Sequence, residues 1–264
     1  MSRVYDITRR SAGLVALAVA LVLSATASAS AQDSDPTEIP ADWPEPIDPS
    51  LRFYWLGIDQ LEWRRNDGPD AFRWDLQGWW GTDRHKAWMK SEGEQSTAGP
   101  SAGDAEVQLL YSRMIAPFWD AQIGVRQDFL FGAGPNRERT FGVLGLQGLA
   151  PYWFELEPSL FVSDDGDVSF RFTGTYDLYV TQRLVAQPRF ELNAAASDAS
   201  KFGIESGVND IELGLRFRYE IRREFAPYLG VNWLRRLGDT ADLARAEGED
   251  LDVLGVVAGI RMQF

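Results

Sequence analysis

The feature that most constrains this chain is a period-two alternation of apolar and polar residues, which runs almost without a break from Leu51 to the last residue. It is clearest over 168–180, where Val, Phe, Tyr and Leu alternate with Ser, Arg, Thr and Asp. Because successive residues of a β-strand point to opposite faces, such a segment carries an aromatic-rich apolar face and a charged face. The same pattern recurs over 184–192, 211–221 and 254–264. The sequence therefore predicts strands with two chemically different faces.

The alternation predicts twelve strands, and several of them are long. We place them at 52–66, 70–81, 85–94, 103–114, 118–132, 138–149, 152–165, 168–181, 182–196, 208–222, 225–237 and 252–264. A strand needs roughly 9–11 residues to cross a bilayer, and several of these exceed that length. The predicted fold class is all-β, an antiparallel transmembrane β-barrel of about 12 strands that occupies residues 51–264.

The connections between the predicted strands fall into two length classes. Short turns are expected at 82–84, 115–117, 150–151, near 181 and at 223–224. Longer connections rich in Gly, Ser, Asp or Glu are expected on the other side, at 95–102, 133–137, 197–207 and 238–251, with short exceptions around Asp67-Gly68 and at 164–166. Bacterial barrels have short periplasmic turns and longer outer loops. The pattern therefore predicts that the last strand ends in the periplasm, on Phe264, a terminal aromatic residue of the kind that characterises outer-membrane barrels.

A soluble β-sandwich is the alternative to a barrel, because it also has alternating strands. A sandwich would not need so many long strands, and it would not repeatedly oppose Arg, Glu and Asp to a stripe of Phe, Tyr and Leu. The negative mean hydropathy of the chain is compatible with a barrel. Only one face of each barrel strand meets lipid, so polar residues on the other face dilute the apolar ones.

The first 50 residues predict two segments outside the barrel. Residues 1–31 predict a cleaved signal peptide, because a basic start leads into a short apolar run and then into Ala29-Ser30-Ala31, which fits the A-x-A cleavage pattern. Residues 32–50 are rich in proline and acidic residues and have little to bury, which predicts a disordered periplasmic segment. Together with the barrel, these segments predict a location in the outer membrane of a Gram-negative bacterium.

The composition excludes several classes of function. The formal net charge is −13, and nucleic-acid binders need clustered positive charge, so no nucleic-acid partner is expected. The chain has no cysteine, which removes disulfides, iron–sulfur clusters and thiolate metal sites. His85 is the only histidine, and no G-x-S-x-G, phosphate-loop or H-E-x-x-H motif is present. We therefore expect that the protein is not an enzyme.

Five strings in the barrel region are distinctive: 88–94 (WMKSEGE), 143–152 (VLGLQGLAPY), 213–230 (LGLRFRYEIRREFAPYLG), 238–242 (GDTAD) and 258–264 (AGIRMQF). Through them, and over roughly residues 50–264, the chain resembles the copper resistance protein B family. The resemblance implies an outer-membrane protein of a periplasmic copper-tolerance system, with copper ion as its ligand and periplasmic copper-handling proteins as partners. Members of that family often carry a Met- and His-rich segment before the barrel, whereas residues 32–50 contain neither.

The polar face of the predicted barrel collects carboxylates and guanidiniums that would line the lumen. They are Asp120, Arg126, Asp128, Glu155, Glu157, Arg171, Asp177, Arg183, Arg189, Glu191, Glu212, Arg216, Arg218 and Glu220. From the chain we select as candidate metal ligands His85, Asp120, Asp128, Glu155 and Glu157. The alternative interpretation is a network of ion pairs that fills a narrow barrel, because buried charges need partners.

Methionine offers no ligand ladder through the predicted pore. Met89 and Met262 share the strand parity of lipid-facing residues, and Met114 is expected at a turn. Three functions remain open from the sequence. They are copper tolerance by binding or export, a small-solute or cation channel, and a structural barrel that docks a partner. In each case the barrel would contact outer-membrane lipid and lipopolysaccharide.

Overall fold

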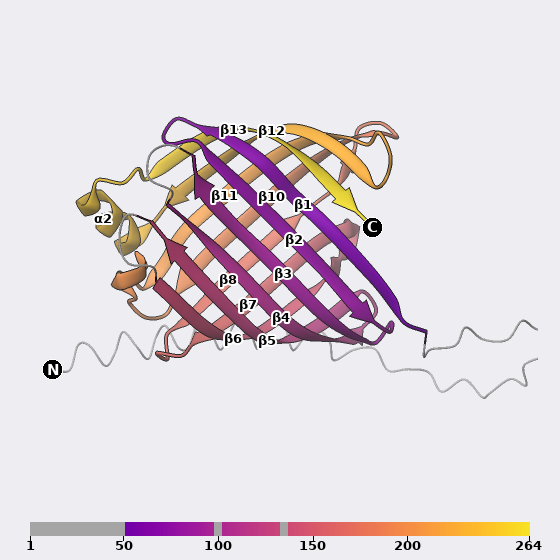
Figure 1. Cartoon of the computed structure of the whole chain (residues 1–264), viewed down its shortest axis with the longest axis horizontal. Helices are drawn as coiled ribbons and strands as arrows, with labels where there is room; N and C mark the ends of the chain where they lie inside the picture. Colours follow the sequence, from indigo (N-terminus) through magenta and orange to yellow (C-terminus); the bar gives the residue numbers. More distant parts are fainter. Residues whose placement is uncertain (1–50, 98–101, 133–136) are drawn as a thin grey trace, which may run out of the picture. The chain divides into compact units, whose positions relative to one another are not determined.

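The computed structural model describes residues 51–97, 102–132 and 137–264, and these residues form a closed antiparallel β-barrel (Figure 1). The predicted signal peptide, 1–31, and the predicted disordered segment, 32–50, lie outside the described residues. Among the described residues, no helix is both long enough and apolar enough to cross a membrane.

The barrel wall consists of strands that match the predicted ones closely. Their bounds are β1 (Phe53–Asn66), β2 (Ala71–Gly81), β3 (His85–Ser96), β4 (Gly103–Ala116), β5 (Trp119–Phe131), β6 (Arg137–Ala150), β7 (Phe154–Ser163), β8 (Val168–Thr175), β9 (Leu178–Tyr179), β10 (Leu184–Ala195), β11 (Gly207–Tyr219), β12 (Phe225–Arg236) and β13 (Asp252–Gln263). The short strands β8 and β9 both pair with β10, so they occupy one position in the wall. The prediction of a twelve-stranded barrel is confirmed.

The barrel closes where the last strand meets the first. β13 pairs antiparallel with both β12 and β1, and β11 pairs with both β10 and β12. The terminal residue takes part, because the Phe264 N–H donates to the Leu56 carbonyl at 2.8 Å and the Leu56 N–H donates to the Phe264 carbonyl at 3.0 Å. Closure leaves no long unpaired edge, which a membrane-spanning sheet cannot tolerate.

The two ends of the barrel differ. We call the end at which β1 begins and β13 ends the turn end, and the opposite end the loop end. The connections at the turn end are short, at 82–84, 117–118, 151–153, 180–183 and 220–224. The longest described connections, 196–206 and 237–251, lie at the loop end. Two short 3₁₀ helices interrupt these connections, at Pro151–Trp153 and Ser200–Phe202.

The loop end carries an α-helix that the sequence did not predict, α2 (Gly238–Glu247). It lies in the segment 238–251, which was expected to be an irregular loop. Its ends have ordinary helix signals, with Asp239 in the first turn and Gly248 in the left-handed conformation at the C-cap. The helix is held to the wall because Thr240 Oγ1 accepts hydrogen bonds from the Glu205 N–H at 2.9 Å and Asn209 Nδ2 at 2.8 Å.

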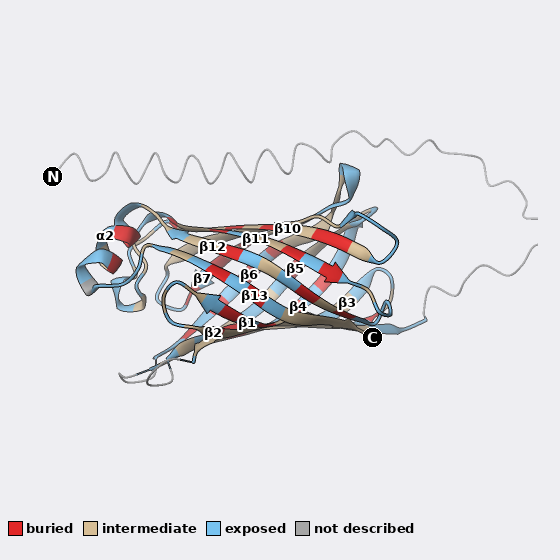
Figure 2. Cartoon of the chain, turned by 90° about the horizontal axis from the view of Figure 1, so that it is seen from above, coloured by how far each residue is buried: buried red, intermediate tan, exposed pale blue. Residues whose placement is uncertain are grey.

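The two faces of the wall are chemically opposite, as the alternation predicted. Large apolar side chains are exposed on the outside, among them Met89, Leu109 and Val256. Charged side chains such as Glu62 and Arg216 are buried on the inside. Burial consequently alternates along the strands (Figure 2). The fold thus places these charged side chains in the lumen.

Candidate functional site in the barrel lumen

The most deeply buried charge of the lumen is Glu62 on β1, whose exposed fraction is 0%. Its two carboxylate oxygens accept hydrogen bonds from Arg216 at 2.8 and 2.9 Å and from Arg64 at 2.8 Å. The Tyr228 hydroxyl also donates to this carboxylate, at 2.9 Å. Arg64 bridges further to Glu212 at 3.0 Å. Each charge is therefore neutralised by a partner, as a buried charge requires.

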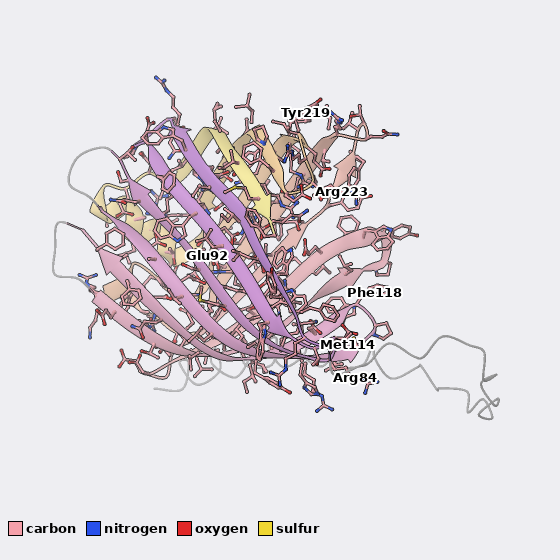
Figure 3. The ribbon with its side chains drawn as sticks, turned by 45° about the vertical axis from the view of Figure 1, so that its right-hand side comes forward. Arg84, Glu92, Met114, Phe118, Tyr219 and Arg223 are labelled. Atoms are coloured by element: carbon pink, nitrogen blue, oxygen red, sulfur yellow. The ribbon has the colours of Figure 1, made fainter. Side chains whose placement is uncertain are left out.

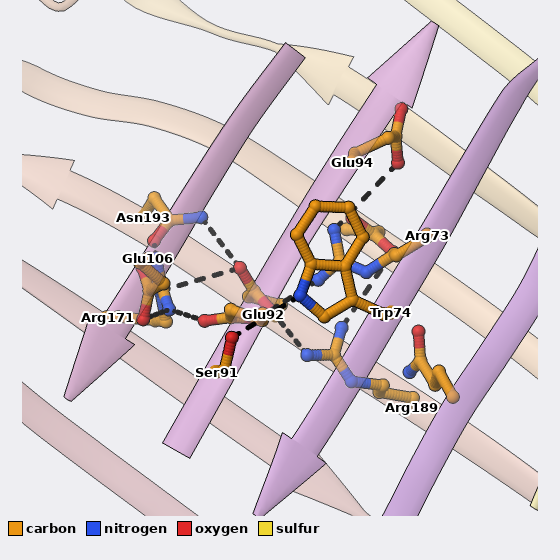
Figure 4. A network of polar contacts seen from close by, with 12 residues as sticks. Arg73, Trp74, Ser91, Glu92, Glu94, Glu106, Arg171, Arg189 and Asn193 are labelled. Atoms are coloured by element: carbon orange, nitrogen blue, oxygen red, sulfur yellow. Dashed lines mark hydrogen bonds and ion pairs between the residues drawn. The ribbon is translucent and has the colours of Figure 1, made fainter. Parts of the chain in front are cut away.

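A second group of ion pairs spans the middle of the lumen (Figure 4). Arg171 on β8 pairs with Glu92 on β3, and with Glu106 on β4 at 3.0 Å. On the other side of Glu92, Arg73 lies 3.2 Å from its carboxylate. Lys90 on β3 likewise pairs with Glu157 on β7. The Arg73–Glu92 pair joins the neighbouring strands β2 and β3. Because β7 and β8 are not neighbours of β3 or β4 in the wall, the pairs of Arg171 and Lys90 cross the lumen and connect separate parts of the wall.

Aromatic rings form the apolar part of the lumen lining. Trp88, Phe141 and Phe161 are buried and pack in one cluster. The Arg126 guanidinium lies 4.6 Å from the centre of the Phe161 ring, and the Lys90 ammonium lies 5.5 Å from the Trp88 ring. Cations above ring faces are attracted by the quadrupole of the ring. The rings therefore help to hold the cationic side chains of the network in place.

A cavity of about 150 Å³ remains between these groups. Its wall contains five acidic side chains, Asp59, Asp75, Glu92, Glu155 and Glu157, and four basic ones, Lys90, Arg171, Arg189 and Arg261. Four of the acidic side chains have a partner, for instance Asp59, which accepts a hydrogen bond from Gln77 at 2.6 Å. Within the described part of the chain, Asp75 makes neither a hydrogen bond nor an ion pair. It also lies directly opposite Glu92 in the β2–β3 register, so two carboxyl groups meet at the cavity.

The structure does not bring the five predicted metal ligands together. His85 is exposed at the turn end, where its Nδ1 lies 2.6 Å from the Tyr111 hydroxyl. Asp120 pairs with Lys86 at 2.5 Å, and Asp128 pairs with Arg126 at 2.5 Å. Only Glu155 and Glu157 share the cavity.

No group of three or more His, Cys, Asp or Glu side chains in the described ranges is arranged to hold a metal ion. Methionine does not fill this role. Met89 is 53% exposed on the outer face, as predicted from its parity. Met114 lies within β4 rather than at a turn. The donor atoms that the lumen offers are therefore mainly carboxylate and amide oxygens.

The sequence interpretation missed part of the network. The predicted lumen charges did not include Asp75, Glu106, Glu62 or Arg64, although each lies in a strand where charged residues alternate with apolar ones. A register shift in β1 between Ile58 and Gln60 hides the pattern there, because it changes which parity faces inward. Arg183, which was predicted to face the lumen, lies exposed in the 180–183 turn, since β10 begins only at the next residue.

The chain matches one known protein family over most of its length. Residues 52–264 match the family described as copper resistance protein B precursor (CopB). The chain is similar to copper resistance protein B of Escherichia coli, with 46% identity over 211 residues, covering 80% of this chain and 69% of that protein. It is also similar to a copper resistance protein B homolog of Pseudomonas syringae pv. tomato, with 39% identity over 217 residues, covering 82% of this chain and 71% of the homolog.

Among solved structures, the barrel resembles the NanC porin with a TM-score of 0.52 and 15% sequence identity, covering 78% of this chain and 98% of the porin. At this identity the likeness concerns the fold alone. The fold and the relatives together place the barrel in the outer membrane.

Proposed function

The chain belongs to the copper resistance protein B family, and from this premise we propose that its lumen gives Cu(II) a weak, carboxylate-lined path that lowers periplasmic copper. The observation that carries the proposal is the cavity whose wall holds five carboxylates, with Asp75 free of any ion pair in the described part of the chain. A carboxylate without a cationic partner is the group most readily shared with a passing cation.

The donor set of the lumen supports Cu(II) as the oxidation state of the ion. Soft thioether and thiolate ligands suit Cu(I), whereas oxygen and imidazole ligands are compatible with Cu(II). The chain has no cysteine, and Met89 lies on the outer face of the barrel. Weak oxygen coordination favours transient binding and release over storage. We expect the copper to come from periplasmic copper-handling partners.

Growth across a copper series tests the proposal. A strain that lacks the protein is complemented with the natural chain or with Asp75→Asn combined with Glu155→Gln. We expect this variant to restore less copper tolerance than the natural chain. The matched control is Asp164→Asn combined with Asp165→Asn, which removes the same charge from an exposed loop-end connection. Full tolerance with the cavity variant would contradict the proposal.

Copper titration of the purified mature protein gives a second test. Weak Cu(II) binding is expected in the natural protein and in His85→Ala, because the His85 ring is already engaged by Tyr111 outside the cavity. Copper binding that disappears in His85→Ala and persists in the cavity variant would show that the site lies at the turn end and not in the cavity. We further propose that the protein has no hydrolytic activity, since among the residues that the structure describes the ring of its lone histidine contacts Tyr111 and no serine.

A further inference from the structure

The turn end of the barrel carries a concentration of exposed arginines. We call the set the arginine rim, and it consists of Arg52, Arg84, Arg113, Arg183, Arg222 and Arg223. The chain as a whole has a net charge of −13, so this end has the opposite sign to the molecule. In the five turns of this end, the exposed acidic residues are Asp83 and Glu224.

The rim arginines have no acidic partner in the part of the chain that the structure describes. None of the six forms an ion pair with any residue in 51–97, 102–132 or 137–264, to which the structure is confined. At the loop end the situation is different, because the exposed Arg235 pairs with Asp252 at 3.6 Å and the exposed Arg245 pairs with Asp242 at 2.5 Å. The excess positive charge at the turn end is therefore available to an external anion.

Aromatic side chains place the rim at the level of a membrane interface. Tyr54 is 76% exposed and Trp80 is 53% exposed near the turn end. The Arg52 guanidinium lies 4.8 Å from the centre of the Trp80 ring. Exposed tyrosine and tryptophan rings form girdles where barrel proteins meet lipid headgroups. A guanidinium beside such a ring is thus at headgroup depth.

The rim has two arcs around the barrel mouth. One arc follows the β1 to β4 region, with Arg52, Arg84 and Arg113, and the other follows the turns beside β10 and β12. Figure 3 shows Arg84 close to Met114 and Phe118 in one part of this end, with Arg223 and Tyr219 in another. The turns between the arcs carry exposed aromatic rings instead, including Phe118 and Trp153, which stand edge to face.

We propose that the arginine rim binds the phosphate groups of anionic phospholipids in the leaflet that surrounds the turn end. A guanidinium presents donors in a fork that matches phosphate, and it is always charged. A lipid annulus fits two separated arcs beside lipid-facing rings. A folded protein partner would instead need a contiguous patch of about 800 Å². The proposal is independent of copper handling.

Native mass spectrometry of the full mature protein tests this inference. The protein is extracted from vesicles made of equal parts phosphatidylethanolamine and phosphatidylglycerol, and the retained lipids are counted for each headgroup. We compare the natural chain, Arg52→Gln with Arg113→Gln in one arc, and Arg183→Gln with Arg222→Gln in the other. The matched control is Arg65→Gln with Arg245→Gln, two exposed arginines at the loop end.

The natural chain and the control are expected to retain phosphatidylglycerol in excess over phosphatidylethanolamine, and each arc variant is expected to lose part of that excess. If one variant does not insert, the other arc and the natural chain still decide the outcome. Equal retention of the two lipids by the natural chain would overturn the proposal. So would an unchanged excess in an arc variant that inserts. In a parallel arm with soluble poly-glutamate, binding without any lipid preference would show a protein-docking surface and overturn the lipid assignment.

Discussion

At the residue scale, Glu62 shows that a charge buried in this barrel is held by several partners. Two arginines and a tyrosine donate to its carboxylate, and no part of the side chain is exposed. Replacing Glu62 with Ala leaves Arg216 and Arg64 without that counter-charge. Removing one partner of a buried ion pair costs about 3–5 kcal/mol. We expect a loss of this order in the free energy of unfolding, measured by urea titration in detergent.

The control for this prediction is Glu138→Ala, which removes an exposed carboxylate from β6. A surface change of this kind is expected to alter the free energy of unfolding by no more than about 0.5 kcal/mol. If Glu62→Ala and Glu138→Ala unfold at the same urea concentration, the ion pairs of Glu62 do not contribute to the free energy of unfolding.

Packing between a glycine and an aromatic ring is a second residue-scale feature. Trp74 on β2 faces Gly93 on β3, and a Cβ at Gly93 would lie 2.4 Å from the Trp74 ring and 2.5 Å from the Asp104 carbonyl oxygen. The backbone oxygen cannot move aside easily, so Gly93→Ala is expected to lower the thermal unfolding temperature. Gly142→Ala is the control, because the nearest atom to its added Cβ is at 3.9 Å. Equal unfolding temperatures would show that the ring can shift at no cost.

At the element scale, α2 is attached to the wall by few groups. The Thr240 hydroxyl accepts hydrogen bonds from the Glu205 backbone and the Asn209 side chain. Thr240→Val keeps the shape of the side chain and removes the acceptor, which leaves buried donors unsatisfied at a cost of about 1–3 kcal/mol. We expect faster amide hydrogen exchange over 238–247 in this variant and unchanged exchange in Asp242→Asn, whose side chain is 72% exposed. Unchanged exchange in Thr240→Val would mean that other contacts hold the helix.

The elements also show how much of the fold can be predicted from the sequence. Period-two alternation placed all twelve wall positions within a few residues, because lipid on one side and charge on the other leave each strand little choice of face. The alternation did not predict features that arise from other interactions. β1 changes parity at a register shift near Ile58. The helix over 238–247 depends on signals at its two ends, which a period-two pattern does not contain. The interruption of the eighth wall position between Thr175 and Leu178 was likewise not predicted.

At the scale of the whole molecule, the pairing of side chains in the lumen depends on contacts between strands far apart in the sequence. A local sequence pattern does not predict such contacts. Arg171 was predicted from the sequence to face the lumen. Its pairing with Glu92 depends on which strands oppose each other across the closed barrel, and that follows from strand number and tilt together. The same holds for the cavity carboxylates, of which sequence named Glu155 and Glu157 but not Asp75.

The cross-lumen ion pairs predict the electrical behaviour of the barrel. Arg171 and Lys90 connect walls that are not adjacent, through Glu92, Glu106 and Glu157, so they narrow the pathway that a solute would follow. In planar bilayers the natural chain should therefore carry a much smaller current than Arg171→Ala combined with Lys90→Ala. Arg235→Ala is the control, since its pair with Asp252 is exposed at the loop end and outside the pathway. A natural chain that conducts as strongly as the double variant would show an open channel, and the network would then be a lining rather than a barrier.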